Sequence, residues 1–346
     1  MLILGIESSC DECSAAIVRD GKVIISNVVA TQTEIHRPYS GVVPELASRT
    51  HTEWIIPVVE KSIADSGLTM RELNGIAVTN RPGLVGSLLV GVSFAKAFAY
   101  TLKIPFAAVD HVRAHLYAPH LEFDITYPYL GLIVSGGHTI ISIVSGYDDI
   151  SILGTTVDDA CGEAFDKVSK HYGFGYPGGL AIDRLSRKGN PACCEFPDPS
   201  MHKADHRYDV SYSGLKTAVI NQIDQFWKSE FKKTPENIAA AFEKTAIDIV
   251  LRRLLAAVRD TGIKKVVAGG GVAANTYLRS ALRGNETLEV FFPSLNLCTD
   301  NGAMIAGIGY HYLRDGRLSA FDVTAASRVD GFRATYPQKL KTRDQV

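Results

Sequence analysis

The chain has 346 residues, of which 46% are hydrophobic and 21% are charged, and this composition excludes an intrinsically disordered protein. Its 36 Lys and Arg residues nearly balance its 37 Asp and Glu residues, and the formal net charge of −1 excludes a protein that binds nucleic acid by bulk charge. A local basic patch stays compatible with that balance. At roughly 100–200 residues per domain, the length predicts two domains or one domain of two lobes.

The cysteines and the N-terminal residues favour a cytoplasmic protein. Six cysteines are few for this length, and we expect them to be reduced thiols. A redox or metal role stays open for the pair Cys10 and Cys13, although no second CxxC accompanies it. The chain does not begin with the charged and apolar regions of a signal peptide. The longest membrane-like stretch, between Arg81 and Lys96, has 14 residues, so we expect a buried helix and no membrane.

The first part of the chain alternates predicted strands with predicted helices, which is typical of an α/β fold. Asp20 and Gly21 form the turn of a hairpin between the second and third strands. The helix after them places Ile55, Val58 and Val59 on one face. In chain order we expect strands at 1–6, 14–19, 22–29, 75–79 and 105–109, and helices at 44–67 and 85–102.

The second part repeats this alternation. One long segment rich in Pro, Gly, His and charge reads as a surface excursion, at 177–216. We expect strands at 129–135, 139–144 and 264–268, and helices at 158–172, 235–261 and 300–313.

One internal similarity indicates a duplicated fold. The segments 4–18 and 130–144 each combine a buried strand, a tight turn of small residues and a returning strand. Such a pair predicts two lobes with a cleft between them, and turns of Ser and Gly let backbone N–H groups approach an anion. We expect 1–108 plus about 314–335 in the N-terminal lobe and 109–313 in the C-terminal lobe. Two unrelated hairpins are the alternative.

Two histidines give the sharpest local signal. His111 and His115 are four residues apart, so on a helix both imidazoles can reach one divalent metal ion. Val112 stands where a metalloprotease needs the Glu of its HExxH motif, which argues against that chemistry. Asp300, before an apolar helix, is the candidate third ligand, and an ordinary helix N-cap is its alternative role.

A glycine run suggests a ligand site. Gly269, Gly270 and Gly271 follow a buried strand and precede a helix, so a ligand can lie against bare backbone at a helix N-terminus. Asn275 would then read a nucleoside. The run matches neither the dinucleotide motif nor the phosphate loop, and a tight strand–helix turn is the alternative.

Acidic residues crowd one predicted helix. Asp159, Glu163 and Asp166 share a face by their spacing. Asp158 and Asp159 suit the stabilisation of a helix N-terminus. Asp166 lies too deep in the helix for that role and is the better candidate for binding.

Two further groups are candidates for binding or proton transfer. Gly178 and Gly179 form a loop of close approach, with Asp183 after it. Asp11 and Glu12, at the tip of the first hairpin, can orient a metal, a water or a nucleophile, or they can be solvated turn residues.

Basic and aromatic residues interleave in the excursion, which holds six Lys or Arg against four Asp or Glu between Arg184 and Lys216. The tail from Arg328 onward holds five against two. These modest excesses are compatible with contacts to a phosphate backbone, and a solvated loop is the more common origin of such a composition. The residues are Arg184, Arg187, Lys188, His202, Lys203, His206, Arg207, Tyr208, Tyr212 and Lys216.

Eight segments in chain order resemble one known family, the bacterial tRNA N6-adenosine threonylcarbamoyltransferases, formerly called O-sialoglycoprotein endopeptidases. The resemblance runs from residue 2 to about residue 330. It rests on 4–12, 41–49, 82–91, 111–115, 134–139, 162–167, 213–217 and 298–306.

The resemblance implies a two-lobed fold of the actin, Hsp70 and sugar-kinase superfamily. It implies transfer of a threonylcarbamoyl group from threonylcarbamoyl-AMP to N6 of the adenosine that follows the anticodon in tRNAs reading ANN codons. It also implies that His111, His115 and Asp300 bind one divalent ion, with Fe²⁺ favoured and Zn²⁺ as the other choice. The residues implied to contact the adenylate are Val134, Ser135, Gly136, Gly137, His138, Asp166, Gly179, Asp183 and Asn275. Asp11 or Glu12 is then our hypothesis for the group that takes the amine proton.

The implied partners are tRNA, a non-catalytic paralogue, a small ATPase and a separate enzyme that makes the adenylate. Two positions depart from the family pattern. Arg113 and Ala114 replace the usual Glu and Gly, which we expect to change the charge beside the metal, and Cys13 replaces a Thr. A phosphotransferase of the same superfamily, the metalloprotease of the older name and a non-catalytic scaffold are the alternatives. The intact metal ligands argue against the scaffold.

Overall fold

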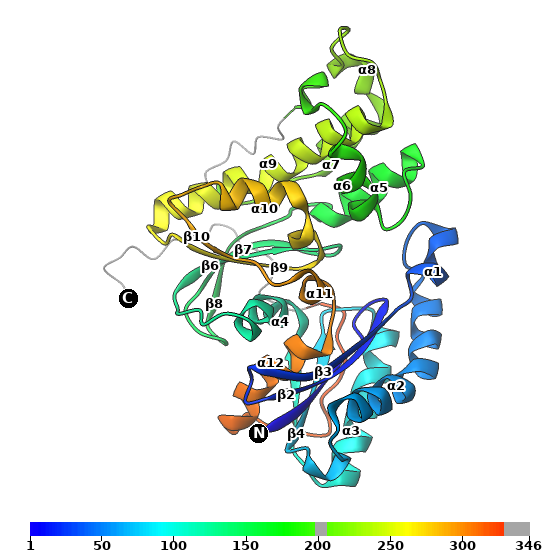
Figure 1. Ribbon diagram of the computed structural model, residues 1–346, viewed down its shortest axis with the longest axis vertical. Coiled ribbons are helices and arrows are strands. Elements are labelled where there is room, and N and C mark those ends of the chain that lie inside the picture. The colour runs from blue at the N-terminus through cyan, green and yellow to red at the C-terminus, as the bar shows by residue number, and fades with distance from the viewer. Residues whose placement is uncertain (198–205, 329–346) are drawn as a thin grey trace.

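Two five-stranded mixed sheets form the framework of the computed structural model, one in each of two lobes stacked along its longest axis (Figure 1). The structure describes residues 1–197 and 206–328. The predictions for residues 198–205, which include His202 and Lys203, and for the tail after residue 328 concern positions outside the described residues.

The first sheet has the strand order β3-β2-β1-β4-β5. Its first three strands are antiparallel, and β1, β4 and β5 are parallel. The predicted hairpin turn is confirmed, because Asp20 and Gly21 both have positive φ angles, of 51° and 69°. The strands are β1 (Leu2–Glu7), β2 (Glu12–Arg19), β3 (Val23–Thr31), β4 (Gly75–Arg81) and β5 (Phe106–Asp110).

The second sheet has the order β10-β9-β6-β7-β8 and repeats the same relations. Strands β6, β7 and β8 are antiparallel, whereas β6, β9 and β10 are parallel. Each strand of the first sheet thus has a counterpart in the second, which confirms the duplicated α/β fold. The strands are β6 (Tyr129–Val134), β7 (Thr139–Val144), β8 (Ile150–Thr155), β9 (Lys265–Gly269) and β10 (Glu289–Phe291).

Helices cover both faces of the first sheet. The helices α2 and α3 pack together over one face, with Ile55, Val58 and Val59 buried as the sequence predicts. The helix α12 packs against β1, β2 and β4 on the other face. The lobe boundary expected near residue 313 stays a prediction. These helices are α1 (Thr33–His36), α2 (Pro44–Ser66), α3 (Val85–Leu102) and α12 (Gly302–Arg314), with short 3₁₀ turns at Arg37–Tyr39 and Met70–Glu72.

Among the described residues, one helix is long and apolar enough to cross a membrane by length and composition, and it is α3. Its buried side chains, which include Leu88, Val92 and Ala95, contact the first sheet and α2. One face of α3 is thus buried, as the sequence predicts, whereas Val85, Leu89 and Tyr100 are exposed, so the helix is only partly buried.

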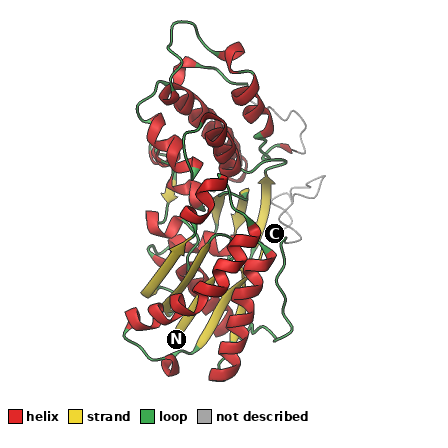
Figure 2. Cartoon of the chain, turned by 90° about the vertical axis from the view of Figure 1, so that its right-hand side faces the viewer, coloured by secondary structure: helices red, strands yellow, loops and turns green. Residues whose placement is uncertain are grey.

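The second lobe ends in a group of helices without strands, at the end farthest from the first lobe (Figures 1 and 2). The short helix α4 (His111–Tyr117) and the turn Ala118–Leu121 connect the two sheets. The remaining helices are α5 (Cys161–Tyr172), α6 (Gly178–Ser186), α7 (Ser213–Asn221), α8 (Ile223–Phe226), α9 (Pro235–Thr261), α10 (Thr276–Arg283) and α11 (Leu295–Cys298), with 3₁₀ turns at Pro191–Cys193 and Gly271–Ala274.

Two expectations need correction here. The segment 177–216, expected to be a surface excursion, contains helix α6, which packs against α5 and α9. The last residues of this segment form the first turn of α7. The helix expected from Asp158 begins only at Cys161. Asp158 instead accepts hydrogen bonds from the backbone N–H groups of Tyr212 and Ser213, at 2.8 and 3.3 Å, and therefore stabilises the start of α7. Asp159 pairs with Lys167 and Lys216.

Candidate active site

His111, His115 and Asp300 form the expected cluster at the junction of the lobes. One ligand atom from each residue lies within 4.8 Å of the other two, so the group can hold a metal ion. The Nε2 atoms of His111 and His115 lie 3.5 and 3.0 Å from Oδ1 of Asp300. Both histidines are buried. Two imidazoles and one carboxylate are a donor set that iron and zinc sites in proteins use.

Local structure explains how these ligands are presented. Asp110, the last residue of β5, caps α4 by accepting hydrogen bonds from the N–H groups of Val112 and Arg113, so the helix starts at His111. Asp300 lies in the short link between α11 and α12. The alternative of an N-cap role for Asp300 is wrong, because Asn301 caps α12 through the Met304 N–H group at 3.0 Å. The Asp300 carboxylate is therefore free to face the histidines.

The buried charges shift one another's protonation. Burial alone would lower the pKa of His111, but the carboxylates of Asp300 and Glu7 raise it to about 9. Burial alone would raise the pKa of Asp300, but His111 and His115 lower it to about 2. Asp300 is thus ionised at neutral pH, as a metal ligand must be.

The hairpin between β6 and β7 lies beside this cluster. Burial, together with the nearby His111 and His115, lowers the pKa of His138 to about 4. Val134 is fully buried at the end of β6. Gly136 and Gly137 are exposed, and a Cβ at either position would meet no atom within 4 Å. Their backbone is open to a ligand. Ser135, between them and Val134, accepts a hydrogen bond from the Gly162 N–H group of α5 through its carbonyl, at 3.1 Å.

The first hairpin faces the second lobe through its acidic tip. The charge of Asp11 contributes to the raised pKa values of Asp166 and Tyr176, so the tip of the first hairpin lies near these residues of the second lobe. Burial is the main cause of the Asp166 shift, to about 6. Burial and the neighbouring Asp11 also raise the pKa of Glu12 well above its usual value.

Asp166 and Gly179 lie on neighbouring helices. The Asp166 carboxylate accepts a hydrogen bond from the Gly178 N–H group, at 2.7 Å, at the start of α6. Gly178 packs tightly against α5, whereas a Cβ at Gly179 would meet no atom. The expected loop of close approach is thus the first turn of a helix, and Gly179 is its open position.

Asp183 and Asn275 belong to a separate hydrogen-bonded network. The Asn275 side chain donates to Glu243 at 2.6 Å and to Asp183 at 3.4 Å, and its oxygen accepts from the Leu278 N–H group at 2.9 Å. Asp183 also accepts from the Thr276 N–H group at 2.8 Å. The Asn275 amide, which the sequence analysis expects to read a nucleoside, is therefore occupied within the protein. A hydrogen bond from the Asn275 side chain to a nucleoside would have to replace one of these internal hydrogen bonds.

The glycine run has two different parts. A Cβ at Gly269 would lie 2.3 Å from the His115 carbonyl oxygen, and one at Gly270 would lie 2.5 Å from that of Val134. The absence of a side chain at these two glycines lets β9 approach α4 and β6 closely. This supports the alternative of a tight strand–helix turn for Gly269 and Gly270. A Cβ at Gly271 would meet no atom within 4 Å, so only this glycine offers open backbone.

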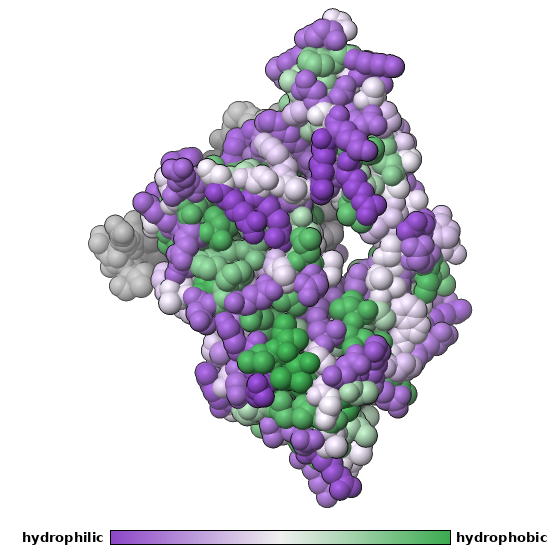
Figure 3. Space-filling model, in the orientation of Figure 1, coloured by the Kyte–Doolittle hydropathy of each residue, from purple (hydrophilic) through white to green (hydrophobic). Residues whose placement is uncertain are grey.

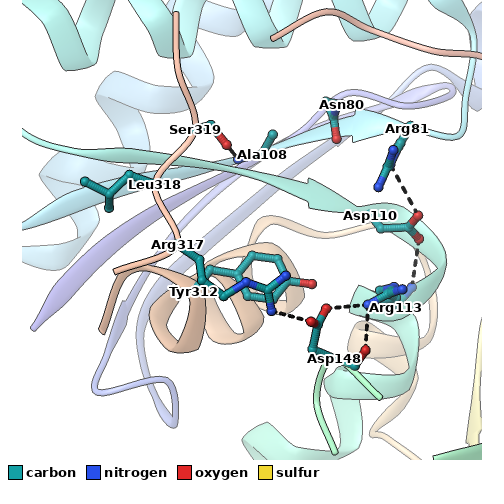
Figure 4. Close-up of a pocket in the computed structure, with 10 residues that line it drawn as sticks. All are labelled: Asn80, Arg81, Ala108, Asp110, Arg113, Asp148, Tyr312, Arg317, Leu318 and Ser319. Atoms are coloured by element: carbon teal, nitrogen blue, oxygen red, sulfur yellow. Dashed lines mark hydrogen bonds and ion pairs between the residues drawn. The ribbon is translucent and has the colours of Figure 1, made fainter. Parts of the chain in front are cut away.

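Arg113 points away from the metal ligands. Its side chain donates to the backbone oxygen of Asp148 at 3.0 Å and pairs with the Asp148 carboxylate, which also pairs with Arg317 (Figure 4). These groups line a pocket of about 380 Å³ that also includes Arg81 and Asp110. The expected change of charge beside the metal is thus wrong: the residue two positions after His111 lies on the opposite face of α4.

The lobes enclose an opening that passes through the molecule on the side of α1 (Figure 3). Lys170 of α5 donates a hydrogen bond to the Tyr39 backbone oxygen, at 3.0 Å, and so connects the lobes. The expected cleft is present.

Sequence reasoning missed two residues that organise these groups. Glu7 is fully buried and bonded to His111, and Glu243 is buried and bonded to Asn275. Each is a lone acidic residue in a buried strand or helix face. That position was the available signal, because a carboxylate is rarely buried without a partner.

Comparison with known proteins follows this geometry. A family model described as tRNA N6-adenosine threonylcarbamoyltransferase matches residues 23–307. A protein of that name from Treponema denticola is 63% identical over 332 residues, covering 96% of this chain and 98% of its own. The one from Borrelia hermsii is 50% identical over 341 residues, covering 98% of this chain and 100% of its own.

Solved structures support the fold alone. Component A of the Acidaminococcus fermentans (R)-2-hydroxyglutaryl-CoA dehydratase has a TM-score of 0.56 at 14% identity, over 91% of this chain and 99% of its own. HypF from T. kodakarensis has a TM-score of 0.62 at 15% identity, over 91% of this chain and 48% of its own. The actin-like fold expected from the sequence is confirmed. On the identity to its curated relatives and the family model that spans most of its length, the chain belongs to the tRNA N6-adenosine threonylcarbamoyltransferase family.

Proposed function

We propose that this protein transfers the threonylcarbamoyl group from threonylcarbamoyl-AMP to N6 of the adenosine that follows the anticodon, in tRNAs that read ANN codons. The observation that carries the proposal is the 63% identity to a named transferase over nearly the whole chain. The His111, His115 and Asp300 cluster is intact, which supports a working enzyme.

One divalent ion would be held by His111, His115 and Asp300. Fe²⁺ is favoured because two histidines and one carboxylate are the usual ligands of non-haem iron, and Zn²⁺ also accepts this donor set. When bound, the ion would polarise a phosphate or carbamoyl oxygen of the donor.

The adenylate would lie along the hairpin and helix ends of the second lobe. The open backbone at Gly136, Gly137 and Gly179 supports this placement, because exposed N–H groups bind phosphate and carboxylate oxygens well. The residues proposed to contact the adenylate are Val134, Ser135, Gly136, Gly137, His138, Asp166, Gly179, Asp183 and Asn275.

Glu12 is the proposed acceptor of the amine proton, with Asp11 as its alternative. An exocyclic adenine amine is a weak nucleophile, so the acyl group must arrive activated as a mixed anhydride. The raised pKa of Glu12 makes its carboxylate a stronger base than that of an ordinary Glu, which suits a proton acceptor. The cleft between the lobes would protect the anhydride from water.

Further proteins would complete the reaction in the cytoplasm. We expect a separate enzyme that makes the adenylate, a non-catalytic paralogue and a small ATPase. Exposed Arg184 and Lys188, at the end of α6, are the proposed contacts to the tRNA backbone. Arg187 is less available, because it pairs with Asp183 and donates to Thr276 at 2.8 Å.

The test is mass spectrometry of nucleosides from unmodified tRNA incubated with synthetic threonylcarbamoyl-AMP, this protein and its proposed partners. We expect threonylcarbamoyladenosine to form only when this protein is present. Phosphoryl transfer to a sugar or an acid, without any modified nucleoside, would instead identify a kinase of the same superfamily.

A further inference from the structure

Glu7 is a buried carboxylate that contacts the metal-ligand candidate His111 on the side of the ring away from Asp300. It is the last residue of β1, and none of its surface is exposed. One of its oxygens accepts a hydrogen bond from the Ser9 N–H group at 2.6 Å. The other lies 2.6 Å from the Thr79 hydroxyl and 2.9 Å from Nδ1 of His111. Burying a charge is costly, so a carboxylate in this place needs all of these partners.

The contact to Glu7 selects one arrangement of the His111 ring. An ionised carboxylate only accepts hydrogen bonds, so the nitrogen that faces it must carry a proton. The Ser9 hydroxyl lies 3.1 Å from the same Nδ1 atom and can share that proton as a second acceptor. When the ring gives up its other proton to bind a metal ion, the lone pair is then on Nε2, which is the atom that faces Asp300.

His115 lacks such support. Its Nε2 atom also faces Asp300, but its Nδ1 atom is buried and has no hydrogen-bond partner among the described residues. Of the two histidines, only His111 thus has a carboxylate at its Nδ1 atom. Glu7 and Thr79 belong to the first sheet, whereas α4 leads into the second lobe, so this contact also fixes the ligand helix relative to the first sheet.

We propose that Glu7 is a positioning residue for the metal centre: it holds the Nδ1–H group of His111 and so keeps Nε2 directed at the ion. Glu7 itself gives no ligand atom. The inference rests on the proposed function only in assuming that the His111, His115 and Asp300 group binds a metal. Partners of ligating histidines typically change metal affinity by about 10–100-fold when they are removed.

The first experiment measures Co²⁺ binding by competition with a chelator, with the visible absorption of Co²⁺ as the readout of coordination. We expect Glu7→Gln to weaken Co²⁺ binding by at least about 10-fold. Asp209→Asn is the matched control, because Asp209 is also buried and accepts from a histidine Nδ1 atom, that of His206 at 2.9 Å, outside the metal cluster. It should bind Co²⁺ as the unmodified protein does, and circular dichroism should show both variants folded.

The second experiment needs no variant at Glu7. In the Zn²⁺-loaded protein with ¹⁵N-labelled histidine, Nδ1 of His111 should show the shift of a protonated nitrogen and Nε2 that of a coordinated one. A coordinated Nδ1 would overturn the proposal, and so would unchanged Co²⁺ affinity in folded Glu7→Gln. Failure of the unmodified protein to bind any metal would instead contradict the metal-assisted function itself.

Discussion

Residues that are neighbours along α4 face different surroundings, because the turn of the helix points successive side chains in different directions. His111 and His115 project toward Asp300, while Arg113 projects into the pocket that Asp148 and Arg317 share. The departure from the family pattern at residue 113 therefore belongs to the contact between the lobes and not to the metal centre.

The metal ligands themselves should be indispensable. His111→Ala or Asp300→Ala removes one of three donors, and we expect bound metal to fall toward zero and threonylcarbamoyl transfer to fall by about 100-fold or more. Metal content by mass spectrometry and nucleoside analysis of tRNA measure the two effects. His171→Ala, which changes an exposed histidine of α5, serves as the control. Full activity of either variant without metal would refute the assigned ligands.

Arg113 should behave in the opposite way. Arg113→Ala loses a partly exposed ion pair with Asp148, and we expect the free energy of unfolding to fall by about 1 kcal/mol. Metal content should stay at that of the unmodified protein. Urea denaturation and metal analysis of the same sample check both statements. Loss of metal would show that Arg113 acts on the cluster after all.

At the scale of elements, the close approach of α12 to β1 sets the position of Asp300. A Cβ at Gly5 would lie 2.1 Å from the Gly302 carbonyl oxygen and 2.5 Å from the Ala306 nitrogen. Both are backbone atoms of α12, and neither can move aside as a flexible side chain can. The absence of a side chain at Gly5 therefore lets the helix that follows Asp300 rest directly on the sheet.

Gly5→Ala should separate these two elements. We expect the free energy of unfolding to fall by about 3 kcal/mol, as overpacking of a core does, together with weaker metal binding. Gly41→Ala is the control, because its Cβ would meet no atom within 4 Å and should change neither quantity. Urea denaturation and metal content are the measurements. An unaltered unfolding curve for Gly5→Ala would contradict the tight contact.

Elements with their own periodic pattern were predictable from the sequence. The helix α3 has the expected bounds, and α2 differs by one residue at its end. The helices α6 and α7 were not predicted, because glycine stands in the first turn of each and α7 relies on Asp158, more than 50 residues away, for its first turn.

The site residues also divide into those that local sequence spacing predicts and those that depend on contacts between distant parts of the chain. The spacing of His111 and His115 is local, so the sequence predicted that these side chains meet. The role of Glu7 was not predictable, because its partners Thr79 and His111 lie 72 and 104 residues away. The choice of Asn301 over Asp300 as the cap of α12 also depends on the folded position of the histidines.

At the scale of the whole molecule, contacts on two sides connect the lobes. The hydrogen bond from Lys170 to Tyr39 joins them on one side, and the Asp148 carboxylate, shared by Arg113 and Arg317, joins them at the pocket. The metal ligands come from α4 and from the link before α12, which both lie at this junction. Both segments are also held on the first sheet, α4 by the contact of His111 to Glu7 and α12 by its packing on β1.

Unfolding of the whole molecule should depend on the protonation of one histidine at this junction. The His120 ring stacks against Tyr117 and Tyr127, with centroids 5.2 and 5.4 Å apart, and its Nε2 atom lies 3.1 Å from the Tyr129 hydroxyl. Burial lowers the pKa of His120 from 6.5 to about 4, with a smaller contribution from Lys22. In the folded protein the His120 ring therefore stays neutral down to about pH 4, whereas in the unfolded chain the same ring takes up a proton below pH 6.5.

The contribution of the neutral His120 ring to the free energy of unfolding is complete above pH 6.5. It is lost as the pH falls toward 4, by about 3 kcal/mol in total. His120→Phe keeps an aromatic ring in the stack but cannot take up a proton. Its free energy of unfolding should fall less steeply between pH 6.5 and 4 than that of the unmodified protein. His171→Phe, at an exposed position, should leave the slope unchanged. Urea denaturation at intervals across this pH range measures the slopes, and equal slopes for all three proteins would show that His120 is protonated in the folded state.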